Sequence, residues 1–325
     1  MRKLCNKIIC GDCIEVLSKV QSAGGGFADL IFADPPFNIG AKYDKYYDKV
    51  KRKNYVAWTE DWMSSCKRVL QPHGSFYIAI GDDYAADVKL IADRIGLVMR
   101  NWIIWHYTFG QQTKNKFARS HTHIFYFVND RNNFTFNDHA VRVPSDRQLV
   151  YNDRRANSKG KIPDDVWSEY SRVCGTFRER EGWHPCQMPE NLLARIITAS
   201  SNLGDCVLDP FVGSGTTAAV AYQLGREYVG IEISESYCEN ARKRLSQLRK
   251  QPRLSTNLIL ESAELAELKR LCADIDKPIQ DIINTDRKNR GKLLGILANQ
   301  FSVRMNNGKK YQPEQIAAAL GVLAV

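Results

Sequence analysis

The sequence predicts an α/β protein in which a mostly parallel sheet is covered by helices. Largely apolar runs bounded by turn residues, such as residues 28–33, are typical of strands buried on both faces. These runs alternate with stretches whose apolar residues recur at helical spacing, as in successive strand and helix units of a parallel sheet. The 325 residues are 44% hydrophobic and 25% charged, which excludes a disordered or fibrous chain.

Strand and helix patterns alternate regularly through the first hundred residues. The helix expected at 55–69 has one apolar face, and we expect both of its tryptophans, Trp58 and Trp62, in the core. The expected elements are, in order, a strand at 7–9, a short helix at 14–17, a strand at 28–33, a helix at 55–69, a strand at 75–80, a helix at 84–94 and a strand at 99–105.

The alternation stops between residues 107 and 183, which are polar and rich in arginine and turn residues, with one expected strand at 124–128. It resumes beyond residue 184 and gives way to a helical pattern after Pro252. The later elements are a helix at 190–199, a strand at 206–209, a helix at 216–224, a strand at 228–233 and a helix at 235–250. We therefore predict a discontinuous α/β domain (1–106 and 184–252), an insert (107–183) and a small α-helical C-terminal domain (253–325).

The positive charge of the chain is concentrated in segments. The net charge is +10, with +4 in residues 40–55, +5 in residues 100–183 and +8 in residues 242–325, which leaves −7 for the remainder. Such concentration predicts a nucleic-acid partner, although solvated helix faces also explain part of the C-terminal surplus.

No apolar run is long enough to cross a membrane, and the nine cysteines are scattered as in reduced proteins. The single Cys-x-x-Cys, Cys10 and Cys13, has no second pair, so we predict no metal site. We expect a cytoplasmic, nucleoid-associated protein without a membrane partner.

A glycine-rich turn lies between the strand at 206–209 and the helix at 216–224. Gly213 and Gly215 allow the backbone to approach a ligand, and the free N–H groups of the helix start can hold an anionic group. Glu232 ends the next strand, where a carboxylate can accept two ribose hydroxyls. This pattern alone also fits a dinucleotide site or a purely structural turn.

Asp34-Pro35-Pro36-Phe37 ends another buried strand, at the sheet edge where open α/β proteins bind ligands. Prolines stiffen a turn and have no N–H of their own, so their neighbouring carbonyls can point outward as acceptors. An amine on an aromatic base is a poor nucleophile because its lone pair is delocalised. Acceptance of its two hydrogens by the Asp34 carboxylate and the Pro35 carbonyl would localise that pair, and Phe37 would stack on the base. A rigid structural turn is the alternative.

Together the two motifs resemble those of the S-adenosylmethionine-dependent DNA amino-methyltransferases, which act on adenine N6 or cytosine N4. The catalytic motif precedes the cofactor motif, which is the order of their beta subclass. The resemblance covers about residues 5–250 and implies a Rossmann-like, circularly permuted seven-strand methyltransferase sheet, with target recognition in residues 107–183. The cofactor residues that it implies are Asp12, Asp209, Phe211, Gly213, Gly215, Thr216 and Glu232.

The segment that begins at His184-Pro185-Cys186-Gln187 resembles the family's His-Pro-Thr-Gln-Lys-Pro segment, but Met188 replaces the lysine. We therefore expect Gln187 and the helix N-terminus to hold the methionine carboxylate of the cofactor. Pro185-Cys186-Gln187 also fits the nucleophile motif of cytosine C5 methylation, but those enzymes place the cofactor motif first. The resemblance implies no metal cofactor.

The resemblance implies double-stranded DNA as substrate, with the target base flipped out of the helix. Basic side chains that follow the catalytic turn or lie in the insert are candidates for DNA contacts. These are Lys42, Lys45, Arg142, Arg147, Arg154 and Arg155. A homodimer and a cognate restriction enzyme are possible partners of such an enzyme.

We predict a site-specific DNA methyltransferase that uses S-adenosylmethionine, with adenine N6 favoured over cytosine N4 by the family's use of Asp at position 34. Two alternatives from other classes remain. A nicotinamide-dependent oxidoreductase would use the same glycine turn but leaves Asp34 to Phe37 unexplained. A DNA-binding protein without turnover would not need an intact Asp34.

Overall fold

The computed structural model describes residues 4–249 except 21–24, 112, 144, 150, 152, 154, 158, 176 and 178. These residues fall into two compact units, 4–136 with 165–249 and, separately, 137–164. The expected C-terminal domain (253–325) and Arg154 lie outside the described residues.

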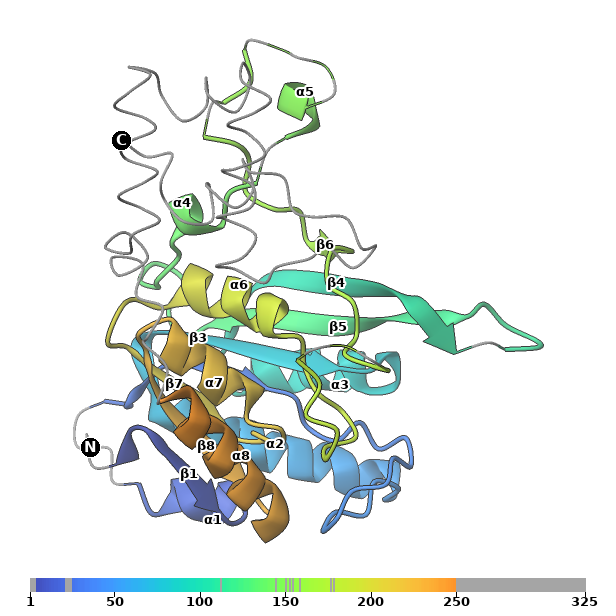
Figure 1. Cartoon of the computed structure of the whole chain (residues 1–325). Coiled ribbons are helices and arrows are strands. Elements are labelled where there is room, and N and C mark those ends of the chain that lie inside the picture. Colours follow the sequence, from blue (N-terminus) through green and yellow to red (C-terminus); the bar gives the residue numbers. More distant parts are fainter. Residues whose placement is uncertain are drawn as a thin grey trace. The chain divides into compact units, whose positions relative to one another are not determined.

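The larger unit is built on an eight-stranded sheet with the order β1-β8-β7-β2-β3-β5-β4-β6 (Figure 1). All neighbours are parallel except β5, which is antiparallel to both β3 and β4. The strands are β1 (Lys7–Cys10), β2 (Ala28–Ala33), β3 (Leu70–Ile80), β4 (Val98–Gln111), β5 (Arg119–Val128), β6 (Val166–Trp167), β7 (Cys206–Asp209) and β8 (Glu227–Glu232).

Helices cover both faces of the sheet, and each face has its own apolar cluster. The first three helices contribute buried side chains to one cluster, and the last three contribute to the other. The helices are α1 (Cys13–Ser18), α2 (Arg52–Val69), α3 (Asp82–Arg94), α4 (Asp138–Val141), α5 (Asp146–Leu149), α6 (Glu190–Ser200), α7 (Thr216–Gln223) and α8 (Glu235–Leu248). None of the described helices is long and apolar enough to cross a membrane.

The α/β class and all seven expected strands are confirmed. The sheet also contains an eighth strand, β6, whose two residues are too few to give a recognisable sequence pattern. The expected insert began at residue 107, yet β5 lies inside the sheet between β3 and β4. A hairpin joins β4 to β5, so no helical pattern separates them and the alternation in the sequence stops there although the sheet continues.

The smaller unit, residues 137–164, contains the short helices α4 and α5 and an antiparallel bridge between Val143 and Lys161. Arg142 binds the Asp138 carboxylate at 2.6 Å and the Gly160 carbonyl at 3.0 Å, which ties α4 to the end of this unit.

Candidate active site

A cavity lies at the carboxyl ends of β8, β7 and β2, three neighbouring parallel strands. It encloses about 950 Å³ including its open mouth. Residues from both motifs line it, so the fold brings together two segments that lie about 170 residues apart. The lining includes Gly11, Asp12, Asp34, Pro36, Tyr43, Lys45, Tyr46, Trp58, His184, Cys186, Met188, Asp209, Phe211, Gly213, Thr216, Glu232 and Tyr237.

Asp34 directly follows β2 and borders the cavity. Among the described residues its carboxylate has no hydrogen-bond partner. Burial, together with the nearby Asp209 carboxylate, raises the pKa of Asp34 to about 7, while Arg172 acts in the opposite direction. The Pro35 carbonyl likewise has no partner in the described part of the chain, whereas the Pro36 carbonyl accepts the Tyr55 hydroxyl at 2.5 Å. Two acceptors at this turn therefore remain free.

The segment after the turn is fixed through one buried carboxylate. Asp48 accepts the backbone N–H groups of Asn38, Ile39 and Ala41 at 2.6, 3.1 and 2.9 Å. Asn38 in turn exchanges two hydrogen bonds with the Val50 backbone, at 2.9 and 2.7 Å. The chain that leaves Asp34 is therefore folded back on itself by side chains, and this fold holds the turn at the sheet edge.

Phe37 does not line the cavity in the described structure. Its ring packs on Gly81 so closely that a Cβ at position 81 would come within 3.3 Å of a ring carbon. The aromatic residues that line the cavity include Tyr43, Tyr46, Trp58 and Phe211 instead.

The glycine turn after β7 is held by backbone bonds. Gly215 donates to the Val212 carbonyl at 2.7 Å, and Val212 donates to Ile231 at 2.9 Å. Gly213 has a φ of +44° and lies against the His184 ring, where a Cβ would approach the Nε2 atom to 2.7 Å. A side chain at position 213 would therefore meet both backbone strain and a ring.

Three further predicted cofactor residues, Asp209, Glu232 and Asp12, line the same cavity. Asp209 is buried, accepts the Phe211 N–H at 2.9 Å, and has its pKa raised to about 7 by burial. Glu232 accepts the N–H groups of Gly213 and Ser234 at 3.0 and 2.9 Å, and burial raises its pKa as well. Asp12 caps α1 by accepting the Ile14 N–H at 2.8 Å.

The aromatic residues around Phe211 form one wall of the site. The Phe211 ring lies edge-on to Trp62 at 5.1 Å and 5.6 Å from Trp58, and Trp58 lies 5.6 Å from Tyr46. The prediction for Trp62 is confirmed, since it is fully buried. The prediction for Trp58 is confirmed in part, because this half-buried ring packs against the core cluster but also lines the cavity.

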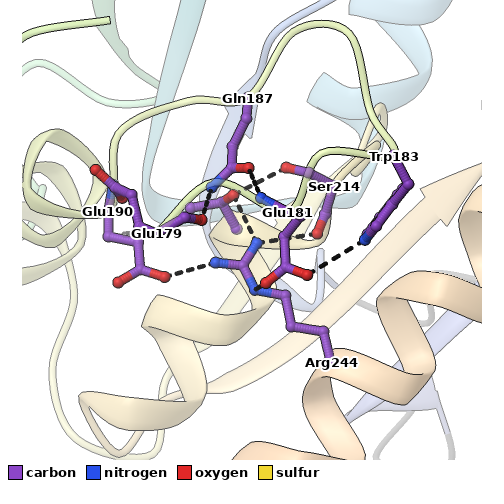
Figure 2. Close-up of polar contacts among 8 residues, drawn as sticks. Glu179, Glu181, Trp183, Gln187, Glu190, Ser214 and Arg244 are labelled. Atoms are coloured by element: carbon purple, nitrogen blue, oxygen red, sulfur yellow. Dashed lines mark hydrogen bonds and ion pairs between the residues drawn. The ribbon is translucent and has the colours of Figure 1, made fainter. Parts of the chain in front are cut away.

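Arg244 of α8 fastens the turn to the segment before α6 (Figure 2). Its guanidinium donates to the Ser214 carbonyl and the Thr216 hydroxyl, each at 3.0 Å. It also pairs with Glu181 at 3.1 Å and with Glu190 at 2.5 Å. One buried cation therefore joins the glycine turn to two carboxylates of another segment.

Gln187 belongs to this same network rather than to the cavity lining. Its amide accepts the Glu181 N–H at 3.0 Å and donates to the Glu179 carbonyl at 2.7 Å, as Figure 2 shows. Glu179 caps α6 through the Glu190 N–H at 2.9 Å, and burial raises its pKa to about 7.

Sequence reasoning missed several residues of the cavity. Tyr43 brings its hydroxyl to 3.9 Å from the Cys186 sulfur, and Asp44 accepts the Ser234 hydroxyl at 2.6 Å. The segment 40–48, expected to contact DNA, thus also spans the cavity toward the end of β8. The aromatic residues among its lysines were the only signal of this role.

The predicted DNA contacts differ in their surroundings. Lys45 lines the cavity, and Lys42 is exposed beside it in a bridge with Tyr47. In the smaller unit Arg142 is paired with Asp138, whereas Arg147 and Arg155 share Asp153. The described residues contain no group of three or more His, Cys, Asp or Glu side chains that could hold a metal ion.

A carboxylate after a buried strand, beside a glycine turn at the same sheet edge, is the arrangement expected of the amino-methyltransferase class. The sequence profile of the N6 and N4 DNA methylase family matches residues 28–243, and the chain belongs to this family. The resemblance seen in the sequence is therefore confirmed.

Two relatives are similar over most of their length. The Type II methyltransferase M.HpaI of Haemophilus parainfluenzae is 38% identical over 240 residues, which are 74% of each chain. The DNA adenine methyltransferase YhdJ of Escherichia coli K12 is 38% identical over 248 residues, or 73% of this chain and 82% of the relative.

Solved structures share the fold at lower identity. The M1.HpyAVI–SAM complex has a TM-score of 0.53 and 23% identity, and the match covers 74% of this chain and 98% of that one. The PvuII cytosine-N4-specific DNA methyltransferase has a TM-score of 0.56 and 18% identity, covering 74% and 90%.

Proposed function

We propose that this protein is a site-specific DNA methyltransferase that moves a methyl group from S-adenosylmethionine to the exocyclic amine of a flipped base. Adenine N6 is the favoured target, because Asp stands at position 34, and cytosine N4 is the second candidate. The observation that carries the proposal is the unpartnered Asp34 carboxylate, which borders the same cavity as the glycine turn and Glu232.

The residues of the cavity fit S-adenosylmethionine. Each Glu232 oxygen accepts one backbone N–H, so a lone pair on each remains for a ribose hydroxyl. A bound sulfonium would favour the ionised forms of Asp34 and Asp209, and Phe211 supplies an apolar ring. When bound, the cofactor supplies an electrophilic methyl group. Gln187 makes its hydrogen bonds away from the cavity, so a contact with the cofactor carboxylate would need its amide to turn.

Asp34 accounts for the activation of the amine. An ionised carboxylate accepts a hydrogen bond from the amine, and the free Pro35 carbonyl is a second acceptor at the same turn. The two bonds pull the nitrogen toward a tetrahedral geometry in which its lone pair is available for attack. Because the pKa of Asp34 is raised to about 7, about half of the Asp34 side chains carry a proton at pH 7 when the cavity is empty.

The first experiment replaces Asp34. Asp34→Asn keeps the shape of the side chain but exchanges a charged acceptor for an amide, and methyl transfer to DNA should fall roughly 100-fold or more. The dissociation constant of S-adenosylmethionine, measured by calorimetry, should stay within about threefold, since the glycine turn is intact. Full activity in this variant would refute the assignment of Asp34.

A second experiment identifies the base and the recognition sequence. Modified-base sequencing of DNA from cells that express the protein should return N6-methyladenine within one short sequence. N4-methylcytosine would select the second candidate, and unmodified DNA would contradict the proposal.

We also propose that Lys42, Lys45, Arg142, Arg147 and Arg155 contribute phosphate or base contacts and that residues 107–183 include the target-recognition region. Association with the nucleoid, a homodimer and a cognate restriction enzyme are compatible with this function.

A further inference from the structure

The β4–β5 hairpin extends beyond the rest of the sheet. The last residue of β3, Ile80, pairs with His123, which pairs with Ile104 of β4. Beyond this level β4 continues to Gln111 and β5 starts at Arg119, so at least four residues of each strand project, or roughly 13 Å. Figure 1 shows the hairpin running out alone past the end of β3.

The hairpin projects from the edge that carries Asp34. β4 runs parallel to β3 and β2, since β5 is antiparallel to both of its neighbours. The carboxyl ends of β2, β3 and β4 therefore lie at one edge of the sheet, and the turn of the hairpin lies farther out on that side. A duplex brought to Asp34 would meet this turn.

The turn carries an apolar ring and positive charge. Phe117 is 100% exposed, although burial of such a ring is worth roughly 2 kcal/mol. Lys114 and Lys116 are exposed beside it, and the Thr113 hydroxyl contacts the Lys116 carbonyl within the turn. Residues 105–128 contain no Asp or Glu.

β5 is anchored where it leaves the turn, so the turn has a firm support. Arg119 pairs with Asp82 at 3.1 Å and with Asp83 at 3.4 Å, which binds the start of β5 to the N-terminus of α3. Lys114 and Lys116, by contrast, form no ion pair with any of the described residues.

We propose that the β4–β5 hairpin is a duplex-opening finger, in which Phe117 inserts between base pairs beside the flipped base while Lys114 and Lys116 bind the flanking phosphates. The inference rests on the proposed DNA substrate. A two-stranded ribbon fits the major groove, and apolar side chains that enter a duplex unstack its bases. Extrusion of a paired base leaves a gap in the stack, and a ring that fills the gap favours the flipped state.

The positive charge favours DNA over a second copy of this chain as the partner of the ring. An apolar protein interface would gain nothing from two flanking lysines without acidic partners, whereas phosphates flank every base step.

The test compares Phe117→Ala with Leu203→Ala, which removes another exposed apolar side chain (61%) from the turn before β7, at the opposite sheet edge. Methylation is measured on a duplex that contains the recognition sequence and on the same duplex with the base opposite the target removed. Phe117→Ala should lower kcat on the paired duplex at least tenfold and at most about twofold on the opened one. Phe117→Trp should retain activity, and Leu203→Ala should leave kcat unchanged on both duplexes.

A second measurement addresses the lysines. In the double variant Lys114→Ala, Lys116→Ala, the slope of log Kd for the duplex against log salt concentration should decrease by about 2. Lys243→Ala, an exposed position on α8, should leave the slope unchanged.

Three results would contradict the proposed role of the hairpin. If Phe117→Ala lowered kcat equally on the paired and opened duplexes, Phe117 would act in folding or general binding. If it lowered kcat on neither duplex, Phe117 would have no role in the reaction. A concentration-dependent oligomer that Phe117→Ala dissociates, with unchanged kcat, would make the turn a contact between copies of the chain. If the unmodified protein methylates neither duplex, the proposed function fails instead.

Discussion

The two loops of the active site start alike and are held differently. Each follows a buried strand that ends at an Asp-Pro pair, and burial raises the pKa of both Asp34 and Asp209 to about 7. The loop after β7 reaches its helix within six residues and is fixed by backbone bonds and left-handed glycines. The loop after β2 needs 18 residues to reach α2 and is fixed mainly by the side chains of Asp48 and Asn38. One loop is therefore defined by its conformation and the other by its contacts.

This difference predicts that one buried side chain controls the position of Asp34. Asp48→Ala leaves three backbone N–H groups without their acceptor, and we expect a loss of about 3 kcal/mol in the free energy of unfolding. Methyl transfer should fall at least tenfold, because the Asp34 turn is no longer held. Urea unfolding and DNA methylation assays measure the two effects.

Asp48→Asn retains one acceptor oxygen and should lie between the unmodified protein and Asp48→Ala in both assays. Wild-type stability in Asp48→Ala would mean that the loop after β2 does not depend on this carboxylate.

The loop after β7 should instead be sensitive to substitutions that strain its backbone. Gly213→Ala introduces a Cβ at a φ of +44° and within 2.7 Å of the His184 ring, and should cost about 2 kcal/mol of stability. The dissociation constant of S-adenosylmethionine should rise at least tenfold by calorimetry, since the turn and His184 must separate.

Gly204→Ala is the matched control, because Gly204 has a φ of +83° but no atom within 4 Å of the added Cβ. It should cost about 1 kcal/mol from backbone strain alone and leave cofactor binding unchanged. Equal effects of the two variants would show that the contact with His184 is unimportant.

The smallest expected effect concerns the pH dependence of stability, to which Asp34 in one loop and Asp209 before the other both contribute. The folded protein holds protons on Asp34 and Asp209 up to about pH 7, whereas the unfolded chain loses them near pH 4. Stability therefore decreases as the pH rises from about 4 to about 7, and the loss is complete above that range.

Asp34→Asn removes one of these ionisations without changing the size of the side chain. At pH 8 its Tm should exceed that of the unmodified protein by about 3 °C, and at pH 4 the two should agree. A Tm difference that is the same at both pH values would show that the carboxylate is not strained by its surroundings.

The features that could be predicted from the sequence are those set by local patterns. The run at 28–33 and the glycines at 213 and 215 place both motifs at strand ends, and the fold joins them in one cavity. Asp48 and Arg244 were not found, because neither an acceptor for the N–H groups of a loop nor a donor to distant oxygens has a characteristic spacing. Trp58 was assigned to the core alone, because helical periodicity reveals an apolar face but does not show that part of this face also borders a cavity.

The order of the strands has a consequence for synthesis of the chain. β2 lies between β3 and β7, and β1 pairs with β8. At roughly 5–20 residues per second, β2 waits about 10 to 35 s after its own translation until β7 emerges from the ribosome. During that interval one edge of β2, the mostly apolar strand that Asp34 follows, lacks its neighbour. Growth of the nascent chain past β8 therefore sets the earliest moment at which the active site can form, and a faster-folding amino-terminal half could not produce an active enzyme sooner.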